Sequence, residues 1–149
     1  MNLGLLMLKT LGPVLALIVS TAKEEGVHPR TLAAIVYMES RGQAGVVGRE
    51  RDGDCSVGLG QIKGSCAPER LARLQDPSVN LHTAAKILKA NERWCRKHVR
   101  EKRCRAGERV FRGGGAVNLY AGNTTKHAAK VWKHRVALAR VWPRQLVRP

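Results

Sequence analysis

One carboxylate lies on an apolar helix stripe, where a surface acid is not expected. In the segment Pro29–Ser40, Leu32 and Ile35 recur at helical spacing, and Glu39 follows Ile35 one turn later. Partial burial raises the pKa of a carboxyl group, which then stays protonated near neutral pH. A protonated glutamate can donate its proton to a glycosidic oxygen as the bond breaks. The alternative is a solvated helix end; the spacing favours an inward-facing carboxyl group, and the choice of a general acid rests on its combination with the motifs that follow in the chain.

The segment after this helix supplies further candidates for a sugar-binding site. Residues 41–57 are rich in glycine and charge without periodicity, which predicts a loop. In SVGLGQI (Ser56–Ile62), Gly58 lets the backbone approach a ligand, and the Gln61 amide can donate to and accept from sugar hydroxyls. Three acids lie in or beside the loop, and they either provide a second catalytic carboxylate or pair with neighbouring arginines: Glu50, Asp52 and Asp54.

The elements that position these residues are predicted to be mainly helical. The 149 residues form a single domain by length, and aromatic residues are scarce at 4%. No long alternating strand pattern occurs, so β-like structure is expected only after Glu39. Beyond the helix at Pro29, the predicted helices are Pro13 to about Gly26, Pro68–Leu74, Val79–Lys97, a short one within Gly113–Asn123, and Thr125–Trp142.

The N-terminus allows two interpretations. The run from Leu11 to Val19, preceded by Lys9, has features of a secretory signal. The same run also suits a buried helix of the domain, which we favour, with residues 1–12 as an N-terminal extension or tether. The uncharged stretch Thr10–Ala22 is short for a bilayer, so no transmembrane span is expected.

The chain is strongly basic. Lysine and arginine number 27 against 11 acids, a formal net charge of +16, and Glu108 is the last acid. Basic residues concentrate between Arg93 and Arg112. Such a charge attracts polyanions, including nucleic acid, anionic lipid and acidic wall polymers.

Four cysteines occur, at positions 55, 66, 95 and 104. No C-x-x-C pattern and no histidine ligand spacing is present, so neither a zinc site nor any other metal or cofactor is expected. Pairing Cys55 with Cys66 and Cys95 with Cys104 would close two short loops and would place the protein in an oxidising compartment. Four free thiols are the alternative.

Four motifs in order resemble a known family. Glu39-Ser40 is followed by SVGLGQI at Ser56–Ile62, DPSVNLHTAAKIL at Asp76–Leu88 and AVNLYAGN at Ala116–Asn123. Together they resemble the soluble lytic transglycosylase domain, which shares its fold with goose-type lysozyme. The resemblance extends from about residue 13 to residue 142. The fourth motif departs from the family pattern A-Y-N-x-G, because Ala121 follows Tyr120.

The resemblance implies a lysozyme-like domain with a substrate cleft. Glu39 would be the catalytic acid and later the base. The substrate-binding residues would be Ser40, Ser56, Gly58, Gln61 and Tyr120, with Asn118 or Asn123 replacing the missing asparagine.

The resemblance also implies the reaction. A lytic transglycosylase needs one carboxyl group to cleave the bond between N-acetylmuramic acid and N-acetylglucosamine and leaves a 1,6-anhydromuramoyl end. A hydrolytic muramidase would use Asp52 or Asp54 as a second carboxylate. Lys63 stands where goose-type enzymes commonly have an aspartate, which favours the lytic reaction.

The expected partners follow from this reaction and from the charge. They are peptidoglycan strands and anionic wall polymers. The protein is expected to be a monomer in the periplasm or cell wall, either exported or delivered by a phage. A basic nucleic-acid-binding helical protein is a remote alternative, because no recognition motif is visible and no specific nucleic acid is expected.

Overall fold

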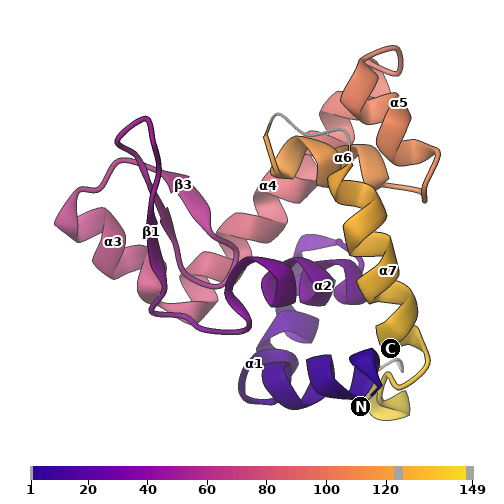
Figure 1. Ribbon diagram of the computed structural model, residues 1–149, viewed down its shortest axis with the longest axis horizontal. Helices are drawn as coiled ribbons and strands as arrows, with labels where there is room; N and C mark the ends of the chain where they lie inside the picture. The colour runs from indigo at the N-terminus through magenta and orange to yellow at the C-terminus, as the bar shows by residue number, and fades with distance from the viewer. Residues whose placement is uncertain (1, 123–125, 147–149) are drawn as a thin grey trace.

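The computed structural model describes residues 2–122 and 126–146 and is mainly helical, as predicted (Figure 1). The helices are α1 (Leu3–Glu25), α2 (Pro29–Ser40), α3 (Pro68–Gln75), α4 (Pro77–Lys97), α5 (Lys102–Glu108), α6 (Gly114–Tyr120), α7 (His127–Ala139) and the 3₁₀ turn η1 (Arg144–Leu146). The strands are β1 (Val47–Arg49), β2 (Cys55–Val57) and β3 (Ile62–Gly64).

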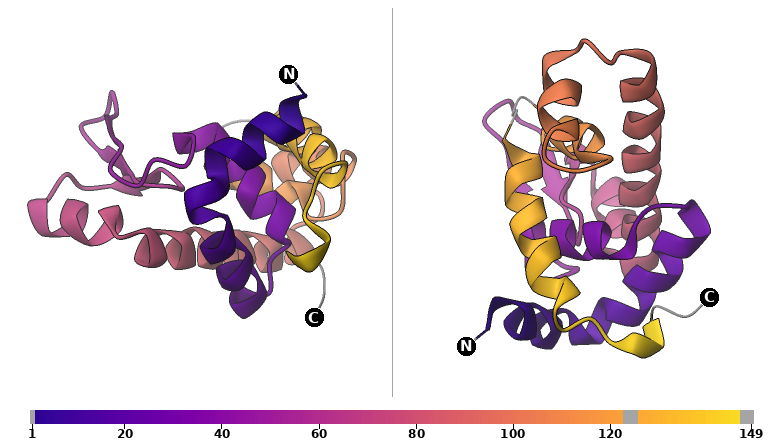
Figure 2. Two further views of the ribbon diagram at one scale, coloured as in Figure 1. Left: turned by 90° about the horizontal axis from the view of Figure 1, so that it is seen from below. Right: turned by 90° about the vertical axis from the view of Figure 1, so that its right-hand side faces the viewer.

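The sheet and α3 lie together on one side of the molecule, and the other helices lie on the opposite side (Figure 1). The long helix α4 continues from α3 beneath the sheet and on into the helical part, as the left view of Figure 2 shows. The C-terminal end of α2 faces the sheet from the helical part (Figure 1). Glu39 therefore lies where the two parts meet.

Helix α1 begins earlier than the sequence predicted. It starts at Leu3, where the Asn2 side chain accepts a hydrogen bond from the Gly4 amide at 2.9 Å, and Pro13 lies inside the helix rather than at its first turn. Proline removes one backbone hydrogen bond and bends a helix, and α1 turns through a bend in Figure 1. The residues before the proline contribute the fully buried Met7 and Leu11 to the core.

Helix α1 is long and apolar enough to cross a membrane. Core helices of folded domains and signal sequences also reach this length and hydropathy. One third of the most apolar 18-residue stretch of α1 is buried inside the protein.

The predicted loop after α2 contains a small antiparallel sheet in the order β1-β2-β3. β2 is the central strand, and its residue Val57 pairs with Val47 on one side and Ile62 on the other. A disulfide from Cys55 to Cys66 ties β2 to the segment after β3 and confirms the first predicted pair.

The turn between β2 and β3 is held by Asn80 of α4. This side chain is fully buried, and its amide nitrogen donates to the carbonyls of Val57 at 2.8 Å and Leu74 at 2.7 Å. Its oxygen accepts from the Gly60 amide at 2.8 Å. At Gly58, which has a φ of 73°, an added Cβ would lie 2.2 Å from the Asn80 side chain. Asn80 thus fixes the β2–β3 turn.

The second predicted disulfide, Cys95–Cys104, joins the end of α4 to α5. Glycines let α6 pack directly on α5: a Cβ added at Gly107 would lie 2.1 Å from the Gly114 carbonyl oxygen. Helix α7 begins at His127, later than the predicted start at Thr125, which lies outside the described residues.

Replacing Asn80 with alanine would leave two buried carbonyls and one amide without partners. We expect Asn80→Ala to lower the free energy of unfolding in urea by about 3 kcal/mol or more, since each such group costs about 1–3 kcal/mol. Asn91→Ala is the matched control, because its side chain donates one long bond, 3.4 Å, to the Ala116 carbonyl. Equal losses in the two variants would contradict the role given to Asn80.

Candidate active site

Glu39 occupies the last turn of α2, and three quarters of its side chain is shielded from solvent. Ile35, one turn earlier, is fully buried, so the apolar stripe predicted from the sequence carries Glu39 towards the interior. The helix ends at Arg41 in the left-handed conformation, φ 54°. Glu39 therefore sits on a rigid element, at the point where the chain turns towards the sheet.

Ser40 anchors this helix end to the sheet. It is 5% exposed, and its hydroxyl lies 2.9 Å from the Leu59 carbonyl and 3.1 Å from the Val36 carbonyl. These contacts fix the distance between α2 and the β2–β3 turn. The structure gives Ser40 a positioning function, and its binding to substrate stays a prediction.

The pKa of Glu39 is raised above the usual glutamate value of 4.5. Burial is the larger cause, because it disfavours the charged form, and the negative charge of Glu50 adds to it. The position at a helix C-terminus acts in the same direction, since the negative end of the helix dipole opposes a carboxylate there. Glu39 thus retains a proton to higher pH than a solvated glutamate.

The hairpin between β1 and β2 places its three acids differently. Glu50 accepts a hydrogen bond from the Ser56 hydroxyl at 2.5 Å, and its charge acts on Glu39. Asp52 is exposed and paired with Lys63, and the pKa of its carboxyl is lowered by that hydrogen bond. Asp54 also belongs to this turn: its amide donates to Asp52 at 3.2 Å and its carbonyl accepts from the Glu50 amide at 2.8 Å.

Tyr120 reaches the site from α6. Its hydroxyl donates to the Gly60 carbonyl at 2.6 Å, close enough that a Cβ added at Gly60 would meet the hydroxyl oxygen at 2.6 Å. Burial raises the pKa of Tyr120 well above its usual value, and the charge of Glu39 raises it further. Tyr120 is therefore neutral and close enough to Glu39 to feel its charge, and its binding to substrate stays a prediction.

His127 at the start of α7 is a site residue that the sequence analysis missed. Its Nε2 atom lies 3.5 Å from the Glu39 Oε1 atom, and its side chain is 11% exposed. Nε2 is buried without a hydrogen-bond partner in the described part of the chain. Burial lowers the pKa of His127, with a smaller contribution from Lys130, so the ring is neutral at physiological pH.

Two further predicted residues form contacts with the backbone. The Gln61 side-chain nitrogen donates to the carbonyls of Gly58 at 3.0 Å and Val46 at 3.3 Å. Asn118 is fully buried; it donates to the Arg103 carbonyl at 3.0 Å and accepts from the Ala128 amide at 2.7 Å. The latter bond fixes the start of α7 and hence the place of His127. Asn123, the other candidate, lies outside the described residues.

The arrangement suits proton transfer by one shielded carboxyl group. Glu39 lies near the neutral phenol of Tyr120 and the neutral imidazole of His127, and the negative charge of Glu50 acts on it. None of the described residues forms a cluster of the kind that binds a metal ion. Such a carboxyl group can act first as an acid and then as a base.

Comparison with known families supports the fold. A family model described as a lysozyme-like domain matches residues 19–96, just over half of the chain. The match includes Glu39, Ser56, Gln61 and Asn80, and it ends before α5, α6 and α7. Comparisons with curated proteins and with solved structures gave no match.

Glu39→Gln is expected to stabilise the protein in a pH-dependent way. Folding raises the pKa of Glu39 above 4.5, so the folded state binds the Glu39 proton more tightly than the unfolded state does. This tighter binding stabilises the fold fully below pH 4.5, and the stabilisation is lost as the pH rises through the folded-state pKa. Glutamine has no proton to lose, so the variant and the wild type should have similar Tm values near pH 4. The variant should have the higher Tm at neutral pH, measured by calorimetry.

Glu69→Gln is the control, since Glu69 is exposed in the first turn of α3 and should show no such gain. A Tm difference between Glu39→Gln and wild type that is constant from acid to neutral pH would contradict the shielded carboxyl group.

Proposed function

Because the chain belongs to the lysozyme-like domain family, whose members cleave the glycan strands of peptidoglycan, we propose that it is a lytic transglycosylase with Glu39 as its acid and base. The bond cleaved would be the β-1,4 bond between N-acetylmuramic acid and N-acetylglucosamine. The observation that supports this best is the shielding of Glu39, which favours the protonated carboxyl group that such a reaction requires.

The reaction has two proton transfers. Glu39 donates its proton to the bridging oxygen, the bond from that oxygen to C1 of the muramic acid breaks, and the N-acetylglucosamine chain leaves as an alcohol. The 6-hydroxyl of the same muramic acid then attacks C1 and returns its proton to Glu39, which closes the 1,6-anhydro ring. Since the nucleophile belongs to the substrate, no bound water is consumed and proximity favours the ring closure.

His127 is proposed to stabilise Glu39 between these two transfers. Once Glu39 has lost its proton, its carboxylate needs a donor, because three quarters of the side chain is shielded from water. The neutral imidazole lies 3.5 Å away with an unpartnered Nε2, so a small movement would let the Nε2–H tautomer donate to Oε1. A hydrogen bond that strengthens as charge develops lowers the barrier.

Hydrolysis is the second candidate, and one observation favours it. Glu50 is a second carboxylate whose charge acts on Glu39 and which Ser56 holds in place. A water molecule activated by Glu50 would attack C1 and give a reducing end. Among the loop acids, Glu50 is thus a better candidate than Asp52, which is engaged with Lys63, and than Asp54, because the charge that raises the pKa of Glu39 is that of Glu50.

The setting is proposed to be the bacterial cell wall. Two disulfides and the apolar helix α1 fit an exported protein. A monomer that acts in the periplasm or wall, delivered by export or by a phage, would use its charge of +16 to approach anionic polymers.

Product analysis separates the two reactions. Purified peptidoglycan digested by the wild type should give muropeptides with 1,6-anhydro ends, lighter by one water than the hydrolytic products and lacking a reducing group. Mass spectrometry detects this difference. Glu39→Gln should slow release by about 10²–10⁴-fold. Reducing ends throughout would identify a hydrolase, and Glu50→Gln should then abolish activity.

The function of His127 is tested by two variants. His127→Leu removes the donor and should lower kcat/KM by about 10–100-fold, the usual loss for a hydrogen bond to a charged group. It should also move the basic limb of the pH–rate profile to higher pH, because the Glu39 carboxylate is then less stabilised. His127→Gln keeps a donor near the position of Nε2 and should restore most of the activity. Equal losses in both variants with an unmoved basic limb would leave His127 with a structural function only.

A further inference from the structure

A second surface feature lies away from Glu39, where α4, α5 and the loop before α6 meet. A hollow of about 470 Å³ has the Cys95–Cys104 disulfide and Val99 in its wall. Four exposed arginines line it, and we call it the arginine pocket: Arg96, Arg105, Arg109 and Arg112. It contains none of the residues placed around Glu39.

The two acids of the arginine pocket are engaged elsewhere. Glu92 is paired with Lys89 at 3.2 Å. Glu108 accepts hydrogen bonds from the backbone amides of Gly113 at 3.0 Å and Gly115 at 3.3 Å. In the described part of the chain, the four arginines form no ion pair and donate no side-chain hydrogen bond. Their guanidinium groups thus remain available to an anion.

The walls of the pocket are rigid. The disulfide joins α4 to α5, and close glycine contacts hold α6 on α5: a Cβ added at Gly115 would lie 2.8 Å from the Cys104 Cα atom. A ligand would therefore bind without first ordering the backbone, which lowers the cost of binding. The wall formed by α4, with Cys95 and Arg96, lies at the end of the match to the lysozyme-like family, and the rest of the pocket lies beyond it.

We propose that the arginine pocket binds the phosphate groups of an anionic wall polymer built from polyol phosphate repeats. Guanidinium groups bind phosphates and carboxylates through paired N–H donors. A planar carboxylate is satisfied by a single arginine, whereas a tetrahedral phosphate accepts from several sides. Arg96 from α4, together with Arg105 and Arg109 from α5 and its C-terminal end, lines one hollow from two elements, which favours phosphate.

Nucleic acid offers the same group, but a single strand also needs aromatic side chains on which its bases stack. Among the residues that the structure describes, no aromatic side chain lines the arginine pocket, and the nearby Trp94 is stacked on His98 at 4.1 Å. The polymer identity rests on the proposed function, because a peptidoglycan enzyme meets such polymers beside its substrate. Tethering would raise the local concentration of glycan at Glu39.

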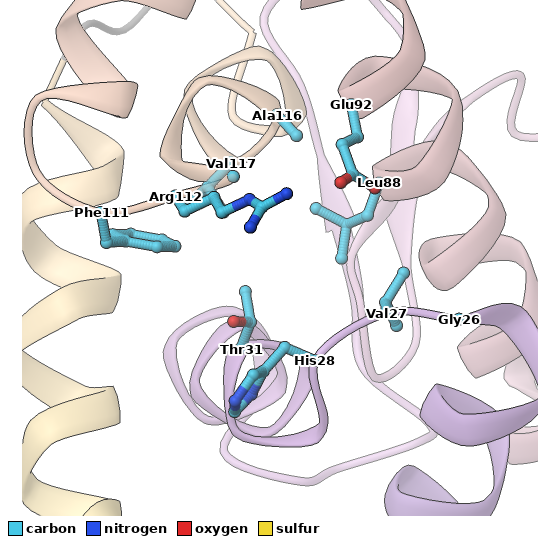
Figure 3. A pocket seen from close by; sticks show the side chains of 11 residues that line it. Gly26, Val27, His28, Thr31, Leu88, Glu92, Phe111, Arg112, Ala116 and Val117 are labelled. Carbon is cyan, nitrogen blue, oxygen red and sulfur yellow. The ribbon is translucent and has the colours of Figure 1, made fainter. Parts of the chain in front are cut away.

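Arg112 also lines a neighbouring hollow of about 280 Å³, and its guanidinium group extends into that space beside Leu88 (Figure 3). The test therefore changes the other three arginines. The triple variant Arg96→Gln, Arg105→Gln, Arg109→Gln is compared with wild type in calorimetric binding of a poly(glycerol phosphate) fragment at fixed ionic strength. The matched control is Arg73→Gln, Lys133→Gln, Arg140→Gln, which removes the same charge from other exposed positions.

The pocket variant should bind at least about tenfold more weakly than wild type, and the control should stay within about twofold. Equal weakening in both variants would show a general charge effect and overturn the proposal. Binding of polyglutamate or of single-stranded DNA with the same affinity as the polyol phosphate would overturn it as well.

Cleavage is measured separately, on peptidoglycan stripped of phosphate polymers. The pocket variant should cleave this substrate at the wild-type rate, and a loss of cleavage there would contradict a pocket that only tethers. If wild type binds the polymer through these arginines but cleaves no peptidoglycan, the proposed function fails while the phosphate site stands.

Discussion

The burial of one carboxyl group at the end of α2 is the constraint on which the rest of the site depends. Water is largely excluded from Glu39, the helix dipole opposes its charge, and Glu50 adds a negative field. Keeping the group in this environment requires a fixed distance between α2 and the sheet. Ser40 sets that distance through the Leu59 carbonyl, and Asn80 holds the other side of the same turn through Gly60. Polar side chains in the core thus maintain the environment of Glu39 without contacting it.

The two halves of the chain contribute differently to this site. The half that matches the lysozyme-like family supplies Glu39, the sheet and the Asn80 network. The later helices supply Tyr120 and His127, and Asn118 links the two elements that carry them. The arginine pocket lies between the end of α4 and this later segment, which the Cys95–Cys104 disulfide joins. The proposed acid and the acidic neighbour that raises its pKa, Glu50, thus lie within the family match, whereas Tyr120 and His127 lie beyond it.

Structural features that depend on the local sequence pattern could be predicted from the sequence. Helical spacing located Glu39 on an inward stripe, and short loops between cysteines favoured the two disulfides that the structure confirms. The start of α1 was predicted wrongly because proline is common in a first turn, whereas here packing of Met7 and Leu11 retains the helix on both sides of Pro13. His127 was missed, although it lies one turn before the buried Val131, because its partner Glu39 is distant in sequence. Glu50 could not be singled out from Asp52 and Asp54 until the hairpin register was known, since that register directs Asp52 to Lys63.

The protonation of Glu39 can be measured directly. A ¹³C-detected NMR titration of the Glu39 side-chain carboxyl carbon, in the full chain with Glu39→Gln to assign the signal, gives its pKa in the folded protein. A midpoint clearly above 4.5, the usual glutamate value, is the predicted result. A midpoint at or below 4.5 would mean that the group is an ordinary solvated carboxylate, and a general acid at this position would then be ruled out.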